Sequence, residues 1–175
     1  MTRSTGFPPV AADDARVLVL GSLPSDRSIA VGEYYAHPRN AFWPIVESLF
    51  GIPADAAYSE RVARLCRCRV ALWDVLQSSL RPGSLDSAID VASATPNRLV
   101  SFLHGHTDLR LVAFNGRKAA DLFERRVRPN CRAPLPRVVT LPSTSPAHAA
   151  MNHVDKLARW TLIRDAAEGR RLPDG

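Results

Sequence analysis

The sequence predicts an α/β fold, a three-layer α/β/α sandwich with a central four-stranded parallel sheet, and three observations support this prediction. Four short runs are almost continuously apolar, as expected for parallel strands that helices cover on both faces. Helical patterns lie between these runs, which implies right-handed crossover connections. The length of 175 residues suits a single domain, 1–175, whose ends at 1–15 and 167–175 are expected to be loosely ordered. The predicted strands are Arg16–Leu20, Arg69–Trp73, Leu109–Phe114 and Arg137–Leu141.

The helices predicted between the strands begin or end at ordinary helix signals. Gly51 suits the position after a helix, where the backbone turns left-handed. Thr95 with Pro96, and Ser145 with Pro146, each resemble an N-cap followed by a proline in the first turn. The predicted helices span 41–50, 58–66, 95 to about 104, 116–126, and a last segment from about His148 or Met151 to Ala166.

Composition excludes several classes of protein. No apolar run approaches the ~20 residues that span a bilayer, and the amino-terminal residues lack the apolar core of a secretory signal. Three cysteines, Cys66, Cys68 and Cys131, do not make a disulfide framework, and a four-cysteine iron–sulfur site is excluded within one chain. We therefore expect a cytoplasmic protein that does not contact a membrane.

The charge balance favours a polyanionic partner. The net charge is +6, from 23 Lys and Arg residues against 17 Asp and Glu residues. Lysine occurs only at Lys118 and Lys156, so arginine supplies nearly all of the positive charge. Arginine suits bidentate recognition of phosphate, and binding a polyanion releases its counterions. The balance supports a nucleic acid partner, although an Arg-rich genome composition would produce it as well.

The segment from Ser22 to Asn40 is long for a connection inside a compact domain, and such loops are usually functional. It carries two Tyr, a His, two Arg and an Asn near the carboxyl end of a buried strand, where open α/β sheets bind ligands. Polar residues also follow the other three predicted strands, in WDVLQ, FNGRK and LPSTSPAHA. Four polar strand ends meeting at one edge predict a site; the alternative for the long segment is an ordinary solvated loop.

The residues available at this edge exclude some chemistries. Gly21-Ser22-Leu23 resembles part of the Gly-Asp-Ser-Leu motif of lipases and esterases, but the Asp is missing, and so is that family's Asp-x-x-His. The five histidines lack the helical spacing of a metal site. We expect neither a metal nor a cofactor. Amides, hydroxyls, one Asp, His and aromatic rings suit the cleavage of an N-glycosidic bond, whose transition state resembles an oxocarbenium ion.

Several short motifs, in order along most of the chain, are similar to those of one known group of enzymes. They resemble the uracil-DNA glycosylase superfamily, and within it most the hypoxanthine-DNA glycosylase family, its sixth branch. HPRNAFW also resembles a segment of the mismatch-specific uracil/thymine glycosylases. The motifs are FPPV at 7–10, ARVLVLGSLPSDRS at 15–28, YYAHPRNAFW at 34–43, ALWDVL at 71–76, GSLDSAI at 83–89, AFNGRKAA at 113–120 and LPSTSPAHA at 141–149.

The resemblance implies a uracil-DNA glycosylase-like fold and a monofunctional DNA glycosylase that acts in base excision repair. Its partner would be DNA, double- or single-stranded, with the damaged base flipped out of the stack, and the protein would act as a monomer. The expected reaction removes hypoxanthine from deoxyinosine and leaves an abasic site. Removal of uracil or xanthine is an alternative, and so is a non-catalytic module that binds nucleic acid.

The resemblance also implies catalytic roles for particular residues. Leu23 stands where the mismatch-specific branch has a water-orienting Asn, so this task falls to Asn40, which matches the catalytic Asn of the hypoxanthine branch. A helix N-cap is the structural alternative for Asn40, and both roles can hold together. Tyr35 matches the aromatic residue that stacks on the flipped base, with ordinary packing as the alternative. His148 is expected to stabilise negative charge or to contact the DNA backbone.

Other residues are expected to bind the base. Asp74 stands where several relatives carry an Asn that reads the base edge. As a carboxylate it would accept a hydrogen bond from an N–H donor such as N1–H of hypoxanthine; the alternative is that it caps a helix or pairs with an arginine. Gly21 and Ser22 would read the edge through their backbone amides. Asn115 would read it through its side chain or serve as a turn residue.

The remaining candidates are expected to hold the DNA backbone. Ser143, Ser145 and Pro146 lie in the segment that resembles the second active-site loop of the superfamily, and Ser25 follows the first strand. Hydroxyls and free amides at the amino end of a helix bind phosphate well. This loop has no large leucine to fill the space that a flipped base vacates. A wedge residue is therefore small or lies elsewhere in the chain.

Overall fold

The computed structural model describes residues 3–173 and is built around a parallel sheet of four strands in the order β3-β2-β6-β7. β2, at the centre of the sheet, pairs in register with both neighbours, so that Leu18 lies opposite Ala71 and Val112. The predicted parallel sheet is confirmed, with every strand end within two residues of its expected position. The strands are β2 (Val17–Gly21), β3 (Val70–Asp74), β6 (Leu111–Asn115) and β7 (Arg137–Leu141).

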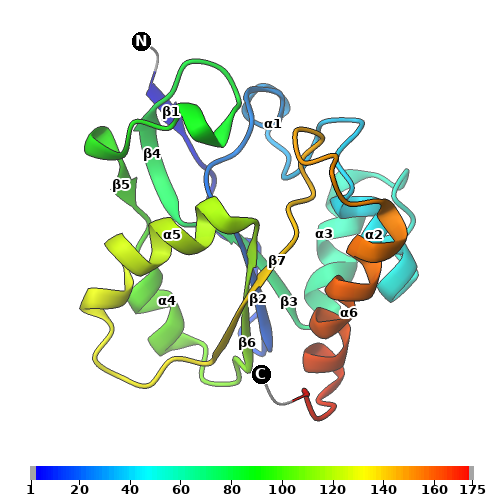
Figure 1. Cartoon of the computed structure of the whole chain (residues 1–175). Coiled ribbons are helices and arrows are strands. Elements are labelled where there is room, and N and C mark those ends of the chain that lie inside the picture. The colour runs from blue at the N-terminus through cyan, green and yellow to red at the C-terminus, as the bar shows by residue number, and fades with distance from the viewer. Residues whose placement is uncertain (1–2, 174–175) are drawn as a thin grey trace.

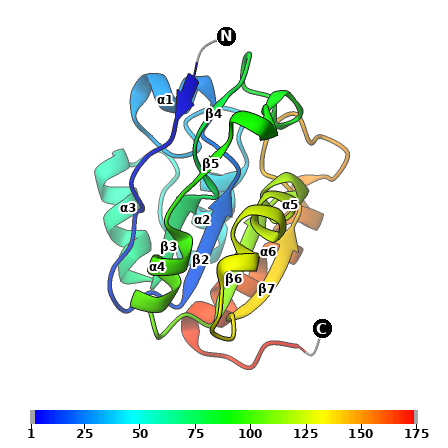
Figure 2. The same cartoon turned by 90° about the vertical axis from the view of Figure 1, so that its left-hand side faces the viewer.

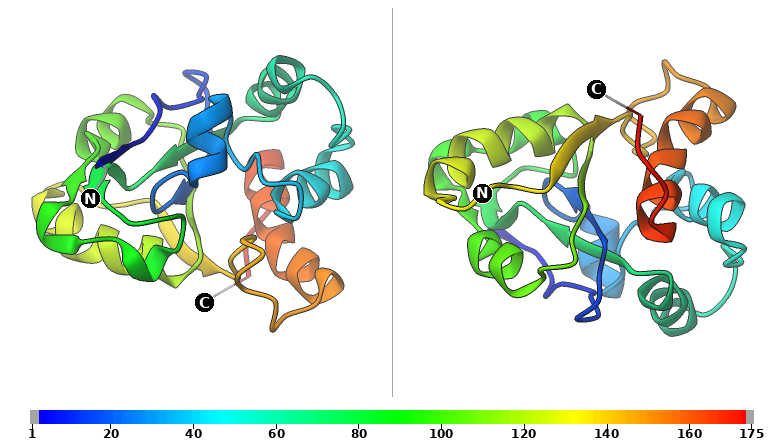
Figure 3. Two further views of the ribbon diagram at one scale, coloured as in Figure 1. Left: turned by 90° about the horizontal axis from the view of Figure 1, so that it is seen from above. Right: turned by 90° about the horizontal axis from the view of Figure 1, so that it is seen from below.

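Helices cover both faces of the sheet, as Figures 1 and 3 show, and complete the predicted three layers. One face carries α4 (Leu99–Gly105) and α5 (Arg117–Arg126). The other face carries α2 (Phe42–Phe50), α3 (Tyr58–Arg67) and α6 (His153–Glu168). No helix within the described range is long and apolar enough to cross a membrane.

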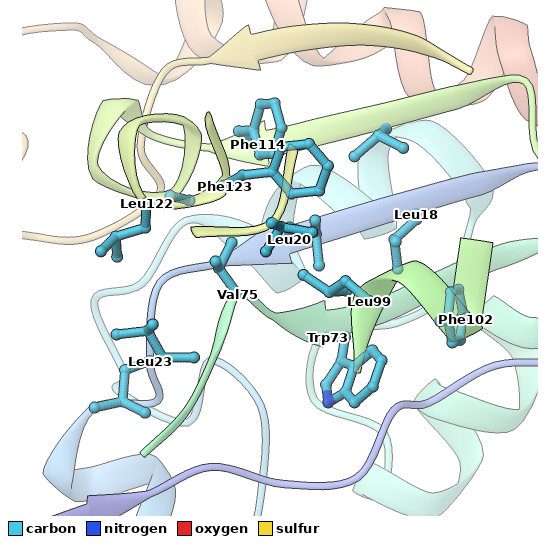
Figure 4. Close-up of a cluster of buried hydrophobic side chains, with 14 of the residues drawn as sticks. Leu18, Leu20, Leu23, Trp73, Val75, Leu99, Phe102, Phe114, Leu122 and Phe123 are labelled. Carbon is cyan, nitrogen blue, oxygen red and sulfur yellow. The ribbon is translucent and has the colours of Figure 1, made fainter. Parts of the chain in front are cut away.

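The strands divide their side chains between two hydrophobic cores, because successive residues of a strand point to opposite faces. Leu18 and Leu20 of β2 pack on the side of α4 and α5, where Figure 4 shows them beside Leu99 and Phe123. Their neighbours in β2 belong to the second core, which Trp160 of α6 shares. Apolar residues fill both sides of each central strand, which explains the continuous apolar runs in the sequence.

A second, antiparallel sheet, visible at the front of Figure 2, was not predicted. It consists of β1 (Arg3–Thr5), β4 (Leu76–Leu80) and β5 (Thr95–Pro96) in the order β1-β4-β5. The predicted helix start at Thr95-Pro96 is therefore wrong. This pair extends along β4, with Pro96 opposite Leu76, and α4 begins only at Leu99.

The start of the described chain is also better ordered than expected. Gly6 N–H donates to the carbonyl of Gln77 at 2.8 Å, and Val10 forms a bridge with Leu72 of β3. The ring of Phe7 meets that of Tyr34 edge-on, with 5.2 Å between centroids. Near the other end, Leu172 packs against the second core. Both ends of the described chain thus make contacts with the domain, while residues 1–2 and 174–175 of the segments expected to be loose lie outside the described residues.

Two further expectations on local structure need correction. The segment 22–40 is not one loop but contains α1 (Asp26–Val31), which Ser25 caps through the N–H of Ser28 and which ends at the left-handed Gly32. Ser145 and Pro146 do not begin α6. Asn152 caps that helix instead, its Oδ1 accepting from the N–H of Asp155 at 2.9 Å. Three short 3-10 segments complete the described chain: Asp86–Ala88, Val91–Ser93 and Arg128–Asn130.

Candidate active site

A cavity of about 620 Å³ opens at the carboxyl edge of the parallel sheet. Figure 1 shows the surrounding loops and α1 at this same end of the sheet. All of the site residues expected from the sequence line the cavity except Pro146, which belongs to the same loop but is not among the lining residues. Their shared location is a finding, whereas their individual roles stay predictions. The lining candidates are Gly21, Ser22, Ser25, Tyr35, Asn40, Asp74, Asn115, Ser143, Ser145 and His148.

Asn40 lies just before α2 and lines the cavity. Its Oδ1 accepts a hydrogen bond from the backbone N–H of Phe42 at 3.0 Å, so the residue satisfies a free donor at the helix start. The N-cap expected at Asn40 needs correction, because Ala41 is the N-cap of α2 and has no side-chain cap, whereas Asn40 lies one residue earlier and bonds the first helical N–H. An amide oxygen has two lone pairs, so Oδ1 can still accept a hydrogen bond from water.

Thr144 connects the loop after β7 to two other parts of the site. Its carbonyl accepts from the N–H of Ala41 at 2.9 Å, next to Asn40 in the chain. Its N–H donates to Oδ1 of Asn115 at 2.9 Å, and its Oγ1 accepts from Nδ2 of Asn115 at 2.8 Å. The Asn115 carboxamide is thus largely used to position this loop, with one N–H left for any other partner.

The rest of the loop after β7 is held by α6. Nε1–H of Trp160 donates to the carbonyl of Pro142 at 3.0 Å, and the ammonium group of Lys156 donates to the carbonyl of His148 at 2.8 Å. Burial lowers the pKa of Lys156, which is enclosed between the loop and the helix. His148 itself is exposed at the cavity. The loop is therefore fixed at both ends, while Ser143 and Ser145 line the cavity.

Replacement of Asn115 by alanine should lower the free energy of unfolding by about 2 kcal/mol, because two buried groups of Thr144 lose their partners. Urea denaturation of wild type and variant measures the difference. Asn130→Ala is the matched control, since Asn130 is exposed and its one side-chain hydrogen bond is long, at 3.4 Å. We expect the control to stay within about 0.5 kcal/mol of wild type. Equal effects at the two positions would contradict the anchoring role of Asn115.

Tyr35 combines an unusual backbone with a fixed ring. Its φ of 58° lies in the left-handed region, which costs a bulky residue about 1–2 kcal/mol. One face of the ring stacks on Phe42, with 4.1 Å between centroids and 26° between planes. Only the opposite face is left for a ligand in the cavity. Burial, and secondarily the charge of Asp74, raise the pKa of the phenol, so Tyr35 stays neutral.

Asp74 is enclosed at the end of β3, with 3% of its surface exposed. Its Oδ2 has no hydrogen-bond partner among the described residues. Its Oδ1 lies 2.5 Å from the place where a Cβ on Gly21 would be, so only glycine fits opposite it. The alternative of an Asp74–arginine pair is not found in the described part of the chain, because the nearby Arg81 is paired with Asp26 at 3.6 Å.

This environment changes the expected charge of Asp74. Burial, reinforced by the nearby Asp86, raises its pKa from the ordinary 3.8 to about 8, and Arg81 opposes this shift only partly. At neutral pH the carboxyl group therefore mainly holds its proton. The expectation of a carboxylate that only accepts hydrogen bonds needs correction. A neutral acid donates through its O–H and accepts through its carbonyl.

Ser22 forms a hydrogen bond with Asp86, a residue that was not predicted from the sequence to belong to the site. Its hydroxyl donates to Oδ1 of Asp86 at 2.5 Å, and Asp86 also lines the cavity. Within the described chain, this is the one side-chain hydrogen bond found for Ser22, and no imidazole is positioned to take its proton. A serine esterase needs such a base. The geometry therefore argues against the esterase alternative.

Asp86, Thr144 and Arg81 are the site residues that sequence reasoning missed. Asp86 and Thr144 lie inside motifs used for the family resemblance, but neither has a spacing that indicates its contacts. Their partners are 64 and 29 residues away in the chain. No group of three or more His, Cys, Asp or Glu residues between positions 3 and 173 is arranged to hold a metal ion.

A parallel sheet with an amide, a buried acid and hydroxyl-bearing loops at its carboxyl edge defines a class of DNA glycosylases. The chain matches the model of the uracil DNA glycosylase superfamily over residues 8–166 and belongs to this family. Its substrate is accordingly DNA. The resemblance found in the sequence motifs is confirmed.

Individual relatives narrow the comparison. Hypoxanthine DNA glycosylase from Methanosarcina acetivorans is 40% identical over 117 residues, which cover 66% of this chain and 73% of the relative. Hypoxanthine DNA glycosylase from Methanosarcina barkeri is 35% identical over 120 residues, or 68% of this chain and 75% of the relative. An NMR solution structure of a candidate uracil DNA glycosylase from M. acetivorans matches with a TM-score of 0.75 and 34% identity, covering 93% of this chain and 99% of that one.

Proposed function

We propose that this protein removes hypoxanthine from deoxyinosine in DNA and leaves an abasic site. The observation that carries the proposal is the shared cavity, in which the Asn40 amide and the buried acid Asp74 both lie at the carboxyl edge of the sheet. The cavity volume of about 620 Å³ is typical of a small-molecule site. The two relatives named hypoxanthine DNA glycosylase support the choice of base.

The reaction uses the amide of Asn40 to direct water. The target nucleotide leaves the base stack and enters the cavity. Oδ1 of Asn40 accepts a hydrogen bond from a water molecule and holds it against the sugar carbon C1′. The bond from C1′ to the base breaks with its electron pair moving to the base, while the water oxygen bonds to C1′. The water gives up one proton to the surroundings, and the base takes up one before it leaves.

Asp74 reads the edge of the base. Hypoxanthine presents an N1–H donor beside an O6 acceptor, and a neutral carboxylic acid offers the complementary pair of groups. Its O–H would donate to O6 and its carbonyl would accept from N1–H. Uracil presents a similar N–H and carbonyl pair, which is why uracil excision is retained as the second candidate. Tyr35, with one face on Phe42, would stack against the base.

Positive charge and hydroxyls around the cavity suit the DNA backbone. Arg117, Lys118 and Arg159 line the cavity, and the chain carries a net charge of +6. Ser143 and Ser145 lie at the same edge, on the loop that Thr144 and α6 hold in place. These groups would hold the phosphates on either side of the target nucleotide. We propose that the protein acts as a monomer, because one chain supplies every group that the mechanism uses.

Labelled oligonucleotides that each contain one deoxyinosine, deoxyuridine or deoxyxanthosine test the proposal. We expect strand cleavage at deoxyinosine only after alkali, which reveals an abasic site. Cleavage before alkali would show a lyase step instead. Binding without excision of any of the three bases would indicate a non-catalytic nucleic-acid-binding module and overturn the proposal. Stronger excision of uracil than of hypoxanthine would select the second candidate.

A further inference from the structure

Leu85 is an exposed apolar residue at the mouth of the cavity. With 57% of its surface exposed, it is one of three exposed large hydrophobic residues in the described chain, together with Val31 and Val154. Single exposed hydrophobic residues are normal. Of these three, however, only Leu85 lines the cavity.

Leu85 belongs to a short segment, Arg81–Ser87, which we call the finger. It leaves β4 of the small antiparallel sheet, and several of its residues line the same cavity as the loop that follows β7. Gly83 in the finger has a φ of 74°, and a Cβ there would meet nothing within 4 Å. The positive φ therefore accompanies a bend of the chain in open solvent, two residues before Leu85.

The finger is fixed on both sides of this turn. Arg81 is 2% exposed, and its guanidinium group donates to the carbonyls of Leu23 and Pro24. On the other side, Asp86 accepts the hydroxyl hydrogen bond of Ser22.

A third contact lies between these two. Oγ of Ser84 accepts from the backbone N–H of Asp26, the first residue of α1, at 2.8 Å. These contacts join the finger to the segment after β2, which also lines the cavity. The finger therefore presents an apolar side chain to solvent from a rigid base, and does not depend on a flexible loop to place it.

We propose that Leu85 is the wedge that enters duplex DNA where the target nucleotide has left the stack. This inference rests on the proposed glycosylase function and adds to it the residue that keeps the nucleotide extruded. Proteins that unstack DNA insert apolar side chains between base steps. Inside the duplex, Leu85 would bury the surface that it now exposes and would block the return of the base. Asp86, its neighbour in the chain, would meanwhile remain with Ser22 at the cavity.

The position of Leu85 offers a wedge residue where the loop after β7 has none. The loop after β7 carries no large leucine, whereas the finger approaches the same cavity from the small sheet. Met151, which also lines the cavity, is the competing candidate. Met151 is partly buried, whereas Leu85 is exposed at the turn of the finger. A wedge must reach outward into DNA, and this favours Leu85.

The test compares duplex and single-stranded deoxyinosine oligonucleotides, because only the duplex has a stack to fill. For Leu85→Ala we expect kcat/KM on the duplex to fall about 10- to 100-fold, as loss of an unstacking contribution predicts. On the single strand the change should stay within about threefold, since the flipping cost is smallest there. Leu85→Met should recover most of the duplex activity. Met151→Ala and Val154→Ala are the matched controls, and neither should show a loss specific to the duplex.

A fluorescent base placed next to deoxyinosine provides a readout that does not depend on the chemical step. 2-Aminopurine brightens when its neighbour leaves the stack, so wild type should raise the signal on binding and Leu85→Ala should raise it less. Equal losses on duplex and single strand, or a duplex loss with Met151→Ala instead, would overturn the wedge assignment while excision by wild type upheld the proposed function. Absence of excision by wild type on every substrate would overturn both.

Discussion

Alanine at position 40 should reduce the rate of deoxyinosine excision by about 10²- to 10³-fold, the usual effect of removing one well-placed polar group from an active site. The effect should fall mainly on kcat, because the proposed task of Asn40 is to orient the water rather than to hold the DNA. Single-turnover assays on duplex deoxyinosine measure the chemical step, and fluorescence anisotropy measures binding. We expect the dissociation constant for DNA, measured by anisotropy, to remain within about threefold of the wild-type value.

The capping hydrogen bond of Asn40 requires a control. Its Oδ1 accepts from the N–H of Phe42 at the start of α2, so the alanine variant also loses this hydrogen bond, which is worth about 1 kcal/mol. Asn40→Ser separates the two roles, because serine caps about as well as asparagine but its hydroxyl is shorter. We expect the serine variant to recover stability in urea denaturation without recovering activity. If it instead excised hypoxanthine at the wild-type rate, Asn40 would be a cap and nothing more.

The second large effect concerns the proton on Asp74. With a pKa of about 8, the carboxyl group of the free enzyme loses its proton as the pH rises through that value. We expect kcat/KM on deoxyinosine to be highest below this pH and to fall tenfold for each further unit, because the ionised group cannot donate to O6 and would repel it. Asp74→Leu should lower kcat/KM by about 10²-fold or more at pH 7, since the base edge is then unpaired.

Asp74→Asn is the matched variant, because an amide also has a donor and an acceptor but does not titrate here. It should keep activity within about tenfold of wild type at pH 7 and should lack the alkaline fall. Dividing the wild-type kcat/KM by that of Asp74→Asn at each pH removes any effect that comes from titration of the base itself. A wild-type profile with the same alkaline shape as that of Asp74→Asn would contradict a neutral Asp74.

Protein stability offers an independent measurement of the same proton. The folded protein holds the proton of Asp74 up to about pH 8, whereas in the unfolded chain the group ionises near its ordinary 3.8. The folded state thus binds more protons between these values, and this group's contribution to the free energy of unfolding decreases as the pH rises from about 4 to about 8. The full shift corresponds to about 5–6 kcal/mol. Urea denaturation should show Asp74→Asn gaining stability relative to wild type over that range.

The parts of the fold that were correctly predicted are those with a strong local pattern. Each central strand is apolar along its whole length because helices cover both of its faces, so its position could be predicted from the sequence without knowledge of its partners. Strand β5 has no such pattern: it has two residues, and its threonine and proline are equally suited to a helix start. Its pairing with β4 makes this segment a strand rather than a helix start, and that long-range pairing cannot be predicted from the local sequence pattern.

The candidate site shows the same division. The polar residues after buried strands, together with the family motifs, were sufficient to predict that Asn40, Tyr35 and Asp74 lie at one site, and all three line the same cavity. The proton on Asp74 depends on burial and on Asp86, neither of which follows from spacing. Ser145 with Pro146 had every local feature of a helix start, yet Asn152 caps α6.

The three hydrogen bonds of Thr144 have a mechanical consequence. This one residue joins the start of α2, the end of β6 and the loop after β7. A pull on any one of them is therefore transmitted to the other two, and they behave as a single rigid body. With Asn40 directing the water as proposed, DNA that binds this loop would meet an amide that is already held in place, and turnover would then depend on extrusion of the nucleotide rather than on closure of the enzyme.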